Sequence, residues 1–294
     1  MKSVNSLHRS YAIAKFLTYF ALIVGALIMI FPFVWMVLTS FKTQAESVSI
    51  PATFFPSEFR LDGYKKVLEN LPFVKLYWNT ILLVFLRVVF AIAFSSMAGY
   101  AFAKLKFRGK NILFTIVLMQ MSLPSQIFII PQYQMVAKLG LVNTIAGLVF
   151  PGLVSAFGVF FLRQTYMGIP EEIGEAAYLD GCNQFQTFYK VMFPLTGTSV
   201  AALTIFTAVF AYGDLMWPQI VNNDINMFTL SAGLSTLRGM DTTNFPMLMA
   251  GSLLAMLPMV VLYLIFQRQF VEALPVLAAN KTRAFSPLSN SPGA

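Results

Sequence analysis

The chain has 294 residues, of which 57% are hydrophobic and 11% charged, with a formal net charge of +8 and a mean hydropathy of +0.71. Soluble domains average about 25% charged residues, so this composition excludes an ordinary soluble globule. The single cysteine, Cys182, and the single histidine, His8, exclude a disulfide framework, a zinc cluster and a Ser-His-Asp triad within the chain. We therefore expect no catalytic residues, no metal site and no cofactor.

Long stretches without charged residues follow one another along the sequence. They lie between Lys15 and Lys42, Lys110 and Lys138, Lys138 and Arg163, Lys190 and Asp214, and Asp241 and Arg268. A sixth stretch, Leu76 to Ala103, is interrupted only by Arg87. Each is long enough for the ~20 residues that cross a ~30 Å hydrocarbon core. Because backbone groups in lipid must bond within their own segment, we expect an all-α membrane protein with six transmembrane helices.

The first apolar stretch follows three basic residues, Lys2, Arg9 and Lys15, and so resembles a signal peptide. It is too long for the hydrophobic region of a signal peptide and has no small-x-small cleavage site. An uncleaved first span is the interpretation that we favour.

The second stretch carries two features of interest. Ala91, Ser95, Gly99 and Ala103 recur every fourth position, a pattern that lets helix backbones approach closely. Arg87 lies near mid-span if the helix starts at about Tyr77, and a cation there costs roughly 2.5–3.5 kcal/mol unless it faces water or a partner. Arg87 either lines a transport pathway or bonds to carbonyls and polar groups inside the bundle, and the second reading is favoured.

The turn at residues 104–110 contains four basic residues and sets the predicted orientation. The positive-inside rule places this turn in the cytoplasm and therefore places both termini inside. The outside loops then fall at about 42–75, 131–142 and 214–246, and a second inside loop at about 163–193. With these boundaries the inside holds 12 basic and five acidic residues, and the outside holds seven of each. The basic excess is thus a membrane orientation signal, and nucleic-acid binding finds no support.

Prolines stand in or beside the later spans. A transmembrane helix that contains proline needs neighbouring helices or a cavity to satisfy the freed backbone groups. The prolines in question are Pro124, Pro131, Pro151, Pro246 and Pro258.

The inside loop at residues 168–195 predicts two short helices joined by a bend. Pro170 suits the first helical position, and Gly181 is placed to take the left-handed conformation that ends the first helix. Asn183 with Gln186 is a capping pair for the second helix, and Pro194 interrupts the chain as it enters the next span. We call residues 168–195 the elbow.

Glu175 beside two alanines, Ala176 and Ala177, is typical of a docking element. The alanines permit close approach, and the carboxylate can accept paired hydrogen bonds from a partner arginine. The alternative, an amphipathic loop on the membrane surface, is disfavoured because the elbow's four carboxylates would be repelled by anionic lipid.

The elbow resembles the signature of permeases of importer-type ABC transporters. That signature is Glu-Ala-Ala, three residues, Gly, nine residues, then Ile-x-Leu-Pro. This chain has Glu175-Ala176-Ala177, Gly181 and Val191-Met192-Phe193-Pro194 at the same spacing. Segments 139–144, 169–172, 212–218 and 228–234 also resemble carbohydrate permeases. Over its whole length the chain is similar to the maltose-transporter-type permease with six spans.

The resemblance implies a heterodimer with a second permease, two ATP-binding subunits, an extracytoplasmic solute-binding protein and a bacterial or archaeal cytoplasmic membrane. It implies that the elbow between spans four and five is a coupling helix. The residues that it assigns to ATPase coupling are Glu175, Ala176, Ala177, Asp180, Gly181 and Pro194. The expected function is import of a sugar, oligosaccharide or polyol by alternating access. Hydrolysis of ATP would occur on the partner subunits, so the chain itself is not expected to be an enzyme.

The expected organisation is a cytoplasmic tail at 1–15, a first span with its outside loop at 16–75, a type I importer core at 76–270 and a cytoplasmic tail at 271–294. Residues 281–294 are rich in Ser, Pro and Asn, which is typical of disorder. The outside loop that begins at Asp214 either touches the binding protein or is an ordinary solvated loop.

Four polar residues are pathway candidates: Arg87, Gln120, Tyr212 and Asp214. Gln126, also at an outside helix end, is a further possible polar group of a cavity. Two other functional classes stay open, an ion-coupled secondary transporter and a membrane assembly protein. The first would need carboxylates inside the spans. The second would not need the spacing of the elbow.

Overall fold

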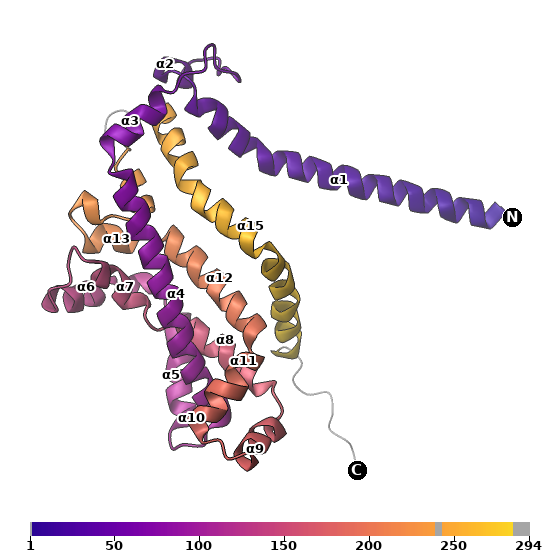
Figure 1. The fold of residues 1–294 in the computed structure, drawn as a ribbon. Coiled ribbons are helices and arrows are strands. Elements are labelled where there is room, and N and C mark those ends of the chain that lie inside the picture. Colours follow the sequence, from indigo (N-terminus) through magenta and orange to yellow (C-terminus); the bar gives the residue numbers. More distant parts are fainter. Residues whose placement is uncertain (1, 239–242, 285–294) are drawn as a thin grey trace. The chain divides into compact units, whose positions relative to one another are not determined.

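The computed structural model describes residues 2–238 and 243–284. Every regular element in these two ranges is a helix. The chain divides into two compact units, Met1–Leu71 with Leu234–Met256 and Pro72–Gly233 with Leu257–Ala294. Each unit is described by itself below, with the helix labels of Figure 1.

Three helical segments in the described ranges are long and apolar enough to cross a membrane alone, namely Lys15–Ser40, Phe73–Lys104 and Phe245–Ile265. Three further pairs of helices meet the same criteria only as pairs, because each bends at a short break: Lys110–Ser122 with Ser125–Lys138 by 104°, Ile145–Gly152 with Ala156–Met167 by 46°, and Gln184–Leu195 with Gly197–Gly213 by 78°. By length and composition, the described ranges therefore contain three helices that can each cross a membrane alone, or as many as six crossings if each bent pair is one span. The breaks fall in the later apolar stretches, where the sequence has prolines.

The first unit contains α1 (Lys2–Ser40), α2 (Gln44–Ser47), α3 (Asp62–Asn70) and the beginning of α15 (Phe245–Ala284). Gly63 lets α3 approach α15, since a Cβ at Gly63 would lie 2.9 Å from the carbonyl oxygen of Pro246. The side-chain amide of Gln44 donates to the carbonyl of Thr243 and accepts from the backbone N–H of Phe245. These contacts connect the segment after the first span to the start of the last one.

The second unit is built around α4, which packs along α8 and α12 (Figure 1). Between residues 72 and 238 the structure has fifteen helical elements, of which η1, η2 and η4 are 3₁₀-helices and η3 is a π-helix. They are α4 (Phe73–Lys104), α5 (Lys110–Ser122), η1 (Ser125–Phe128), α6 (Ile129–Lys138), α7 (Ile145–Val149), η2 (Phe150–Gly152), α8 (Ala156–Met167), α9 (Glu171–Leu179), α10 (Gln184–Gln186), η3 (Thr187–Met192), α11 (Phe193–Leu195), α12 (Gly197–Gly213), α13 (Met216–Val221), η4 (Ile225–Met227) and α14 (Leu230–Ser235).

The small residues of α4 face α8, as the packing interpretation predicts. A Cβ on Gly99 would lie 2.9 Å from the backbone nitrogen of Arg163, and one on Gly158 would lie 2.4 Å from Ser95 Oγ. Ala91 and Ser95 are fully buried. The repeat of small residues therefore sets the close spacing of these two helices.

The third apolar stretch, which contains Pro124 and Pro131, is divided by a sharp bend. Helix α5 ends at Ser122 after 13 residues, about 20 Å at 1.5 Å per residue, which is too short to cross a ~30 Å core. Leu123 is extended because it precedes Pro124, and the chain then turns by 104° into η1 and α6. The bend therefore lies at Leu123 and Pro124, before the expected outside loop at 131–142.

The ends of the chain are described in part. Helix α1 includes the expected amino-terminal tail from Lys2 onward, and α15 continues to Ala284. Residues 281–284 are thus helical, although the sequence favours disorder there. The remainder of that tail, residues 285–294, lies outside the described residues.

Candidate functional site

The elbow has the local structure that its capping residues predict. Helix α9 begins at Glu171, with Pro170 as the N-cap, one residue earlier than its expected helical position. At the other end, the N–H of Cys182 donates to the carbonyl of Ala177 and that of Gly181 to Tyr178, each at 3.0 Å. Gly181 has a φ of +83°. This is a Schellman motif, and it requires the left-handed conformation that glycine adopts without strain.

The second half of the elbow begins with the predicted capping box. The backbone N–H of Asn183 donates to Gln186 Oε1, and the N–H of Gln186 donates to Asn183 Oδ1, both at 2.9 Å. A π-helical turn, η3, follows and closes with a bond from the N–H of Phe193 to the carbonyl of Phe188. Since Pro194 has no N–H and its ring crowds the preceding turn, the wider π-turn accommodates it. The chain then bends by 78° before α12.

The elbow has a buried inner face. Gly174 and Ala177 are buried, and a Cβ on Gly174 would lie 3.2 Å from the methyl group of Met192. Gly174 therefore does not kink α9, and its missing side chain lets α9 pack on η3. Met192 belongs to a core that also contains Tyr100, Phe161, Leu162, Tyr166, Ala202 and Leu203. The elbow is consequently packed onto the ends of α4, α8 and α12.

The outer face of the elbow exposes both apolar and charged side chains. Leu179 is 89% exposed and Phe185 68% exposed. Glu175 and Ala176 are also exposed, and Glu175 makes no hydrogen bond or ion pair within the described part of the chain. An exposed leucine and phenylalanine beside a carboxylate form a surface suited to a protein partner.

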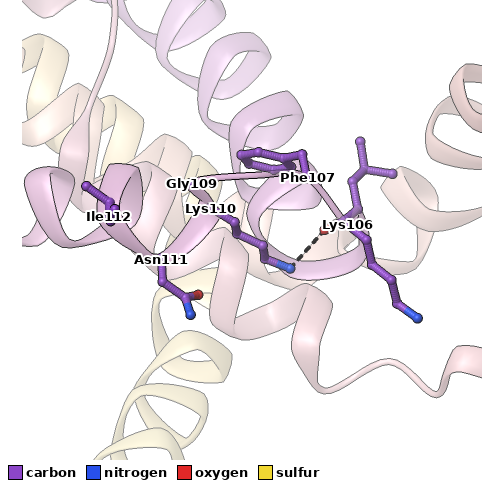
Figure 2. Close-up of a pocket in the computed structure, with 7 residues that line it drawn as sticks. Lys106, Phe107, Gly109, Lys110, Asn111 and Ile112 are labelled. Atoms are coloured by element: carbon purple, nitrogen blue, oxygen red, sulfur yellow. Dashed lines mark hydrogen bonds between the residues drawn. The ribbon is translucent and has the colours of Figure 1, made fainter.

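The basic turn lies next to the beginning of α9 in the same unit. Lys104 donates to the carbonyl of Ile169, the residue before Pro170. The ammonium group of Lys110 donates to the carbonyl of Leu105 at 3.0 Å, the bond dashed in Figure 2. It also donates to the carbonyl of Ala103 at 3.2 Å, so Lys110 satisfies carbonyls at the end of α4. A surface pocket of about 450 Å³ is lined by Leu105, Lys106, Phe107, Gly109, Lys110, Asn111 and Ile112. Two of the four basic residues thus have structural partners.

Arg87 joins three elements of the second unit. Its Nη1 lies 2.9 Å from Asp214 Oδ2, just after α12, and its Nη2 donates at 2.8 Å to the carbonyl of Leu148 in α7. A Cβ on Gly152 would lie 2.7 Å from Arg87 Nε, so glycine is needed there. The side chain of Arg87 is 12% exposed and that of Asp214 22% exposed. The expected bonding of Arg87 to carbonyls and polar groups inside the bundle is confirmed.

Arg87 and Asp214 also line a cavity of about 1330 Å³ in the same unit. Its wall combines aromatic and aliphatic side chains with uncharged polar ones. The polar residues among the lining are Ser125, Gln126, Gln132, Ser155, Thr207 and Gln219. The aromatic residues are Phe157, Phe206, Phe210 and Trp217. A mostly apolar wall with a few converging polar groups is typical of a small-molecule site.

The four pathway candidates fall into two groups. Arg87 and Asp214 are brought together across 127 sequence positions and line the cavity. Gln120 lies exposed on α5, and Tyr212 lies near the end of α12 with its carbonyl accepting from Ser231, and neither is part of the lining. The polar residues 125, 132, 155, 207 and 219 are not candidates in the sequence analysis, because no local pattern indicates that their segments meet.

The chain is similar in sequence to known transport proteins. The sequence model of the family described as "Binding-protein-dependent transport system inner membrane component" matches residues 91–274. The chain is 37% identical to the arabinooligosaccharides transport system permease protein AraQ of Halalkalibacterium halodurans, over 85% of this chain and 91% of that protein. It is 29% identical to the sn-glycerol-3-phosphate transport system permease protein UgpE of Escherichia coli, over 86% and 93% of the two chains.

A solved structure has the same fold. It is the crystal structure of a bacterial ABC transporter involved in the import of the acidic polysaccharide alginate, with a TM-score of 0.76 and 22% sequence identity. The similarity covers 88% of this chain and 97% of the other. The chain thus has the fold of a known membrane transporter component.

Proposed function

Because the chain belongs to the family of binding-protein-dependent transport system inner membrane components, we propose that it is the permease subunit of an ATP-driven importer for a carbohydrate. The class of substrate is supported by the relatives, which are named for arabinooligosaccharides and for glycerol 3-phosphate. The substrate is a sugar, an oligosaccharide or a related polyol. The chain translocates it, and partner subunits hydrolyse ATP.

The geometry of the elbow is the observation that best supports its role in coupling. Its inner face is packed on α4, α8 and α12, and its outer face presents Glu175, Ala176 and Leu179 to the solvent. A rigid element with this arrangement can convert a displacement of a bound partner into a displacement of the helices beneath it. The coupling residues are Glu175, Ala176, Ala177, Asp180, Gly181 and Pro194.

Each coupling residue has a distinct physical task. Glu175 accepts bonds from an arginine or lysine of the ATP-binding subunit, and Ala176 allows close approach of that partner. Ala177, which is 5% exposed, packs inward. Gly181 and Pro194 fix the two bends that hold the elbow in place, and Asp180 adds negative charge just before the first of them.

The proposed complex contains a second permease, two ATP-binding subunits and an extracytoplasmic solute-binding protein. Each bent helix pair counts as one span, which gives six spans and places both termini in the cytoplasm. Counted from Lys104 at the inner boundary, about 20 residues of α4 cross the hydrocarbon core. Arg87 lies 17 residues before Lys104, about 26 Å along the helix, and is therefore near the outer boundary rather than at mid-membrane.

The cavity lined by Arg87 and Asp214 is this subunit's half of the translocation pathway. In alternating access it is open to the outside in one state and to the inside in the other. Gln120 and Tyr212 lie outside its lining.

Co-purification and reconstitution test this function. The tagged chain, expressed with its neighbouring transport genes and extracted in mild detergent, is expected to bring down an ATPase subunit and a second permease. In proteoliposomes the complex is expected to accumulate a neutral arabinooligosaccharide only with ATP inside and binding protein outside. Uptake driven by an ion gradient without ATP would instead support a secondary transporter. Absence of both partners and of uptake would support an assembly protein.

A further inference from the structure

The charges in the wall of the cavity cancel. Among the described residues that line it, the charged ones are Arg87 and Asp214, and they form an ion pair with 2.9 Å between Nη1 and Oδ2. The remaining polar groups are amides and hydroxyls. This half of the pathway therefore presents no net charge to a ligand.

The positive charge of Arg87 is also fixed in place. Asp214 and the carbonyl of Leu148 accept from its two terminal nitrogens, and Gly152 packs against its Nε. Asp214 is held in turn, because its other oxygen accepts from the backbone N–H of Trp217 at 3.4 Å. An anionic ligand that approaches Arg87 would have to compete with the carboxylate of Asp214, which already neutralises the charge of the guanidinium.

The rest of the wall suits an uncharged carbohydrate. Hydroxyl groups of a sugar exchange hydrogen bonds with amide and hydroxyl side chains such as Gln126, Gln132 and Thr207. The C–H faces of a sugar ring pack on aromatic rings, and Phe157 and Phe206 lie edge to face in the wall with centroids 6.0 Å apart. A phosphate or carboxylate would be desolvated in the same wall without an available cation, which is costly.

From these observations we infer that the cavity selects neutral oligosaccharides over acidic sugars and sugar phosphates, and that Asp214 sets this selectivity by neutralising Arg87. The inference rests on the proposed function and narrows its substrate class. It separates this chain from the relative named for sn-glycerol-3-phosphate and from the solved importer of acidic alginate, whose names both refer to anionic ligands.

Direct binding to the permease complex tests the inference without the selectivity of the binding protein. The complex of both permeases and the ATPase subunits is placed in lipid nanodiscs, and saturation-transfer NMR is recorded with arabinotriose and with trigalacturonate. These probes have similar size but differ by three carboxylates. The wild-type complex is expected to bind arabinotriose more tightly by about tenfold or more, because the carboxylates of trigalacturonate would lose their hydration without gaining a cation.

Two variants assign the selectivity to the ion pair. Asp214→Asn leaves Arg87 unneutralised, and its affinity for trigalacturonate is expected to rise about tenfold. Arg87→Gln with Asp214→Asn removes both charges without leaving one unpaired, and this double variant is expected to keep the preference for arabinotriose.

Three results would overturn the inference. They are equal binding of the two probes by the wild type, binding of neither probe, and a double variant that gains affinity for trigalacturonate. ATP-driven uptake by the same complex is measured separately. Selective binding without uptake would refute the proposed transport function alone, whereas uptake with unselective binding would refute only the inferred selectivity.

Discussion

The elbow and the wall of the cavity around Arg87 are both parts of the second unit, but different kinds of interaction hold them. In the elbow, each cap and bend depends on residues within a few positions, such as Asn183 and Gln186. In the cavity wall, Arg87 depends on Leu148 and Asp214, which are 61 and 127 positions away. A single substitution in the elbow should therefore change local geometry, whereas one in the wall should disturb three helices at once.

The largest effect is expected for Arg87→Ala. It leaves the partly buried carboxylate of Asp214 without its cation and should lower the free energy of unfolding by about 3 kcal/mol. Thermal unfolding of the purified complex, followed by size-exclusion chromatography, measures the loss. Arg87→Ala combined with Asp214→Ala should recover much of it, because the uncompensated charge is gone. If the stability losses of Arg87→Ala and Asp214→Ala simply add in the double variant, the two side chains are not energetically coupled.

A smaller effect, confined to transport, is expected for Gly181→Val. A β-branched residue at a φ of +83° should strain the elbow by about 1–2 kcal/mol. Uptake should fall while the complex still assembles, as measured by uptake in proteoliposomes and by co-purification. Gly109→Val is the matched control, since Gly109 has a φ of +79° with open space around its Cβ position in the basic turn. If both variants lose uptake equally, backbone strain alone would explain the effect.

Asn183→Ala should have a still smaller effect. It removes the capping box at the start of α10, which is worth about 1 kcal/mol. The expected result is a slightly lower melting temperature and a modest fall in uptake. Asn183→Asp keeps the acceptor oxygen and should behave as the wild type. An unchanged Asn183→Ala variant would mean that core packing alone fixes the second half of the elbow.

The smallest effect concerns a second capping box, at the start of α2 in the first unit. Its carboxylate, Glu46, can be protonated. Hydrogen bonds from Ser57 and Thr43 lower the pKa of Glu46 from 4.5 to about 2. A lowered pKa stabilises the loop above the unfolded value, and this contribution is lost as the pH falls through about 2. Pepsin cleavage within residues 42–60 of the purified complex should therefore increase as the pH falls from 4 to about 2. Glu46→Gln should lack this pH dependence.

The same contrast explains what the sequence predicts. The Schellman motif and the capping box follow from neighbouring residues, and the structure contains both. Pro194 lies inside α11, and the chain bends after Leu195 rather than at the proline itself. The boundary at Pro170 is shifted by one residue. The family signature at the elbow is likewise local, and the match over residues 91–274 confirms the family.

The shape of the spans and the composition of the cavity are harder to predict from the sequence. Charge-free length predicts a crossing, but it contains no information about a bend of 104° at Pro124. The sequence places Asp214 at the start of an outside loop, and nothing within a few residues of it points to Arg87. Such a pair depends on how α4, α7 and α12 pack together, so its partners are set by tertiary structure.

The ratio of uptake to ATP hydrolysis in Glu175→Lys tests the central claim most directly. Lysine at this exposed position reverses the charge that the ATP-binding subunit is proposed to contact. In proteoliposomes with binding protein, the account predicts that hydrolysis continues while uptake falls to background. Glu69→Lys, the same change at an exposed position on α3, should transport as the wild type does. Normal uptake for each ATP hydrolysed by Glu175→Lys would contradict the assignment of the elbow as the coupling element.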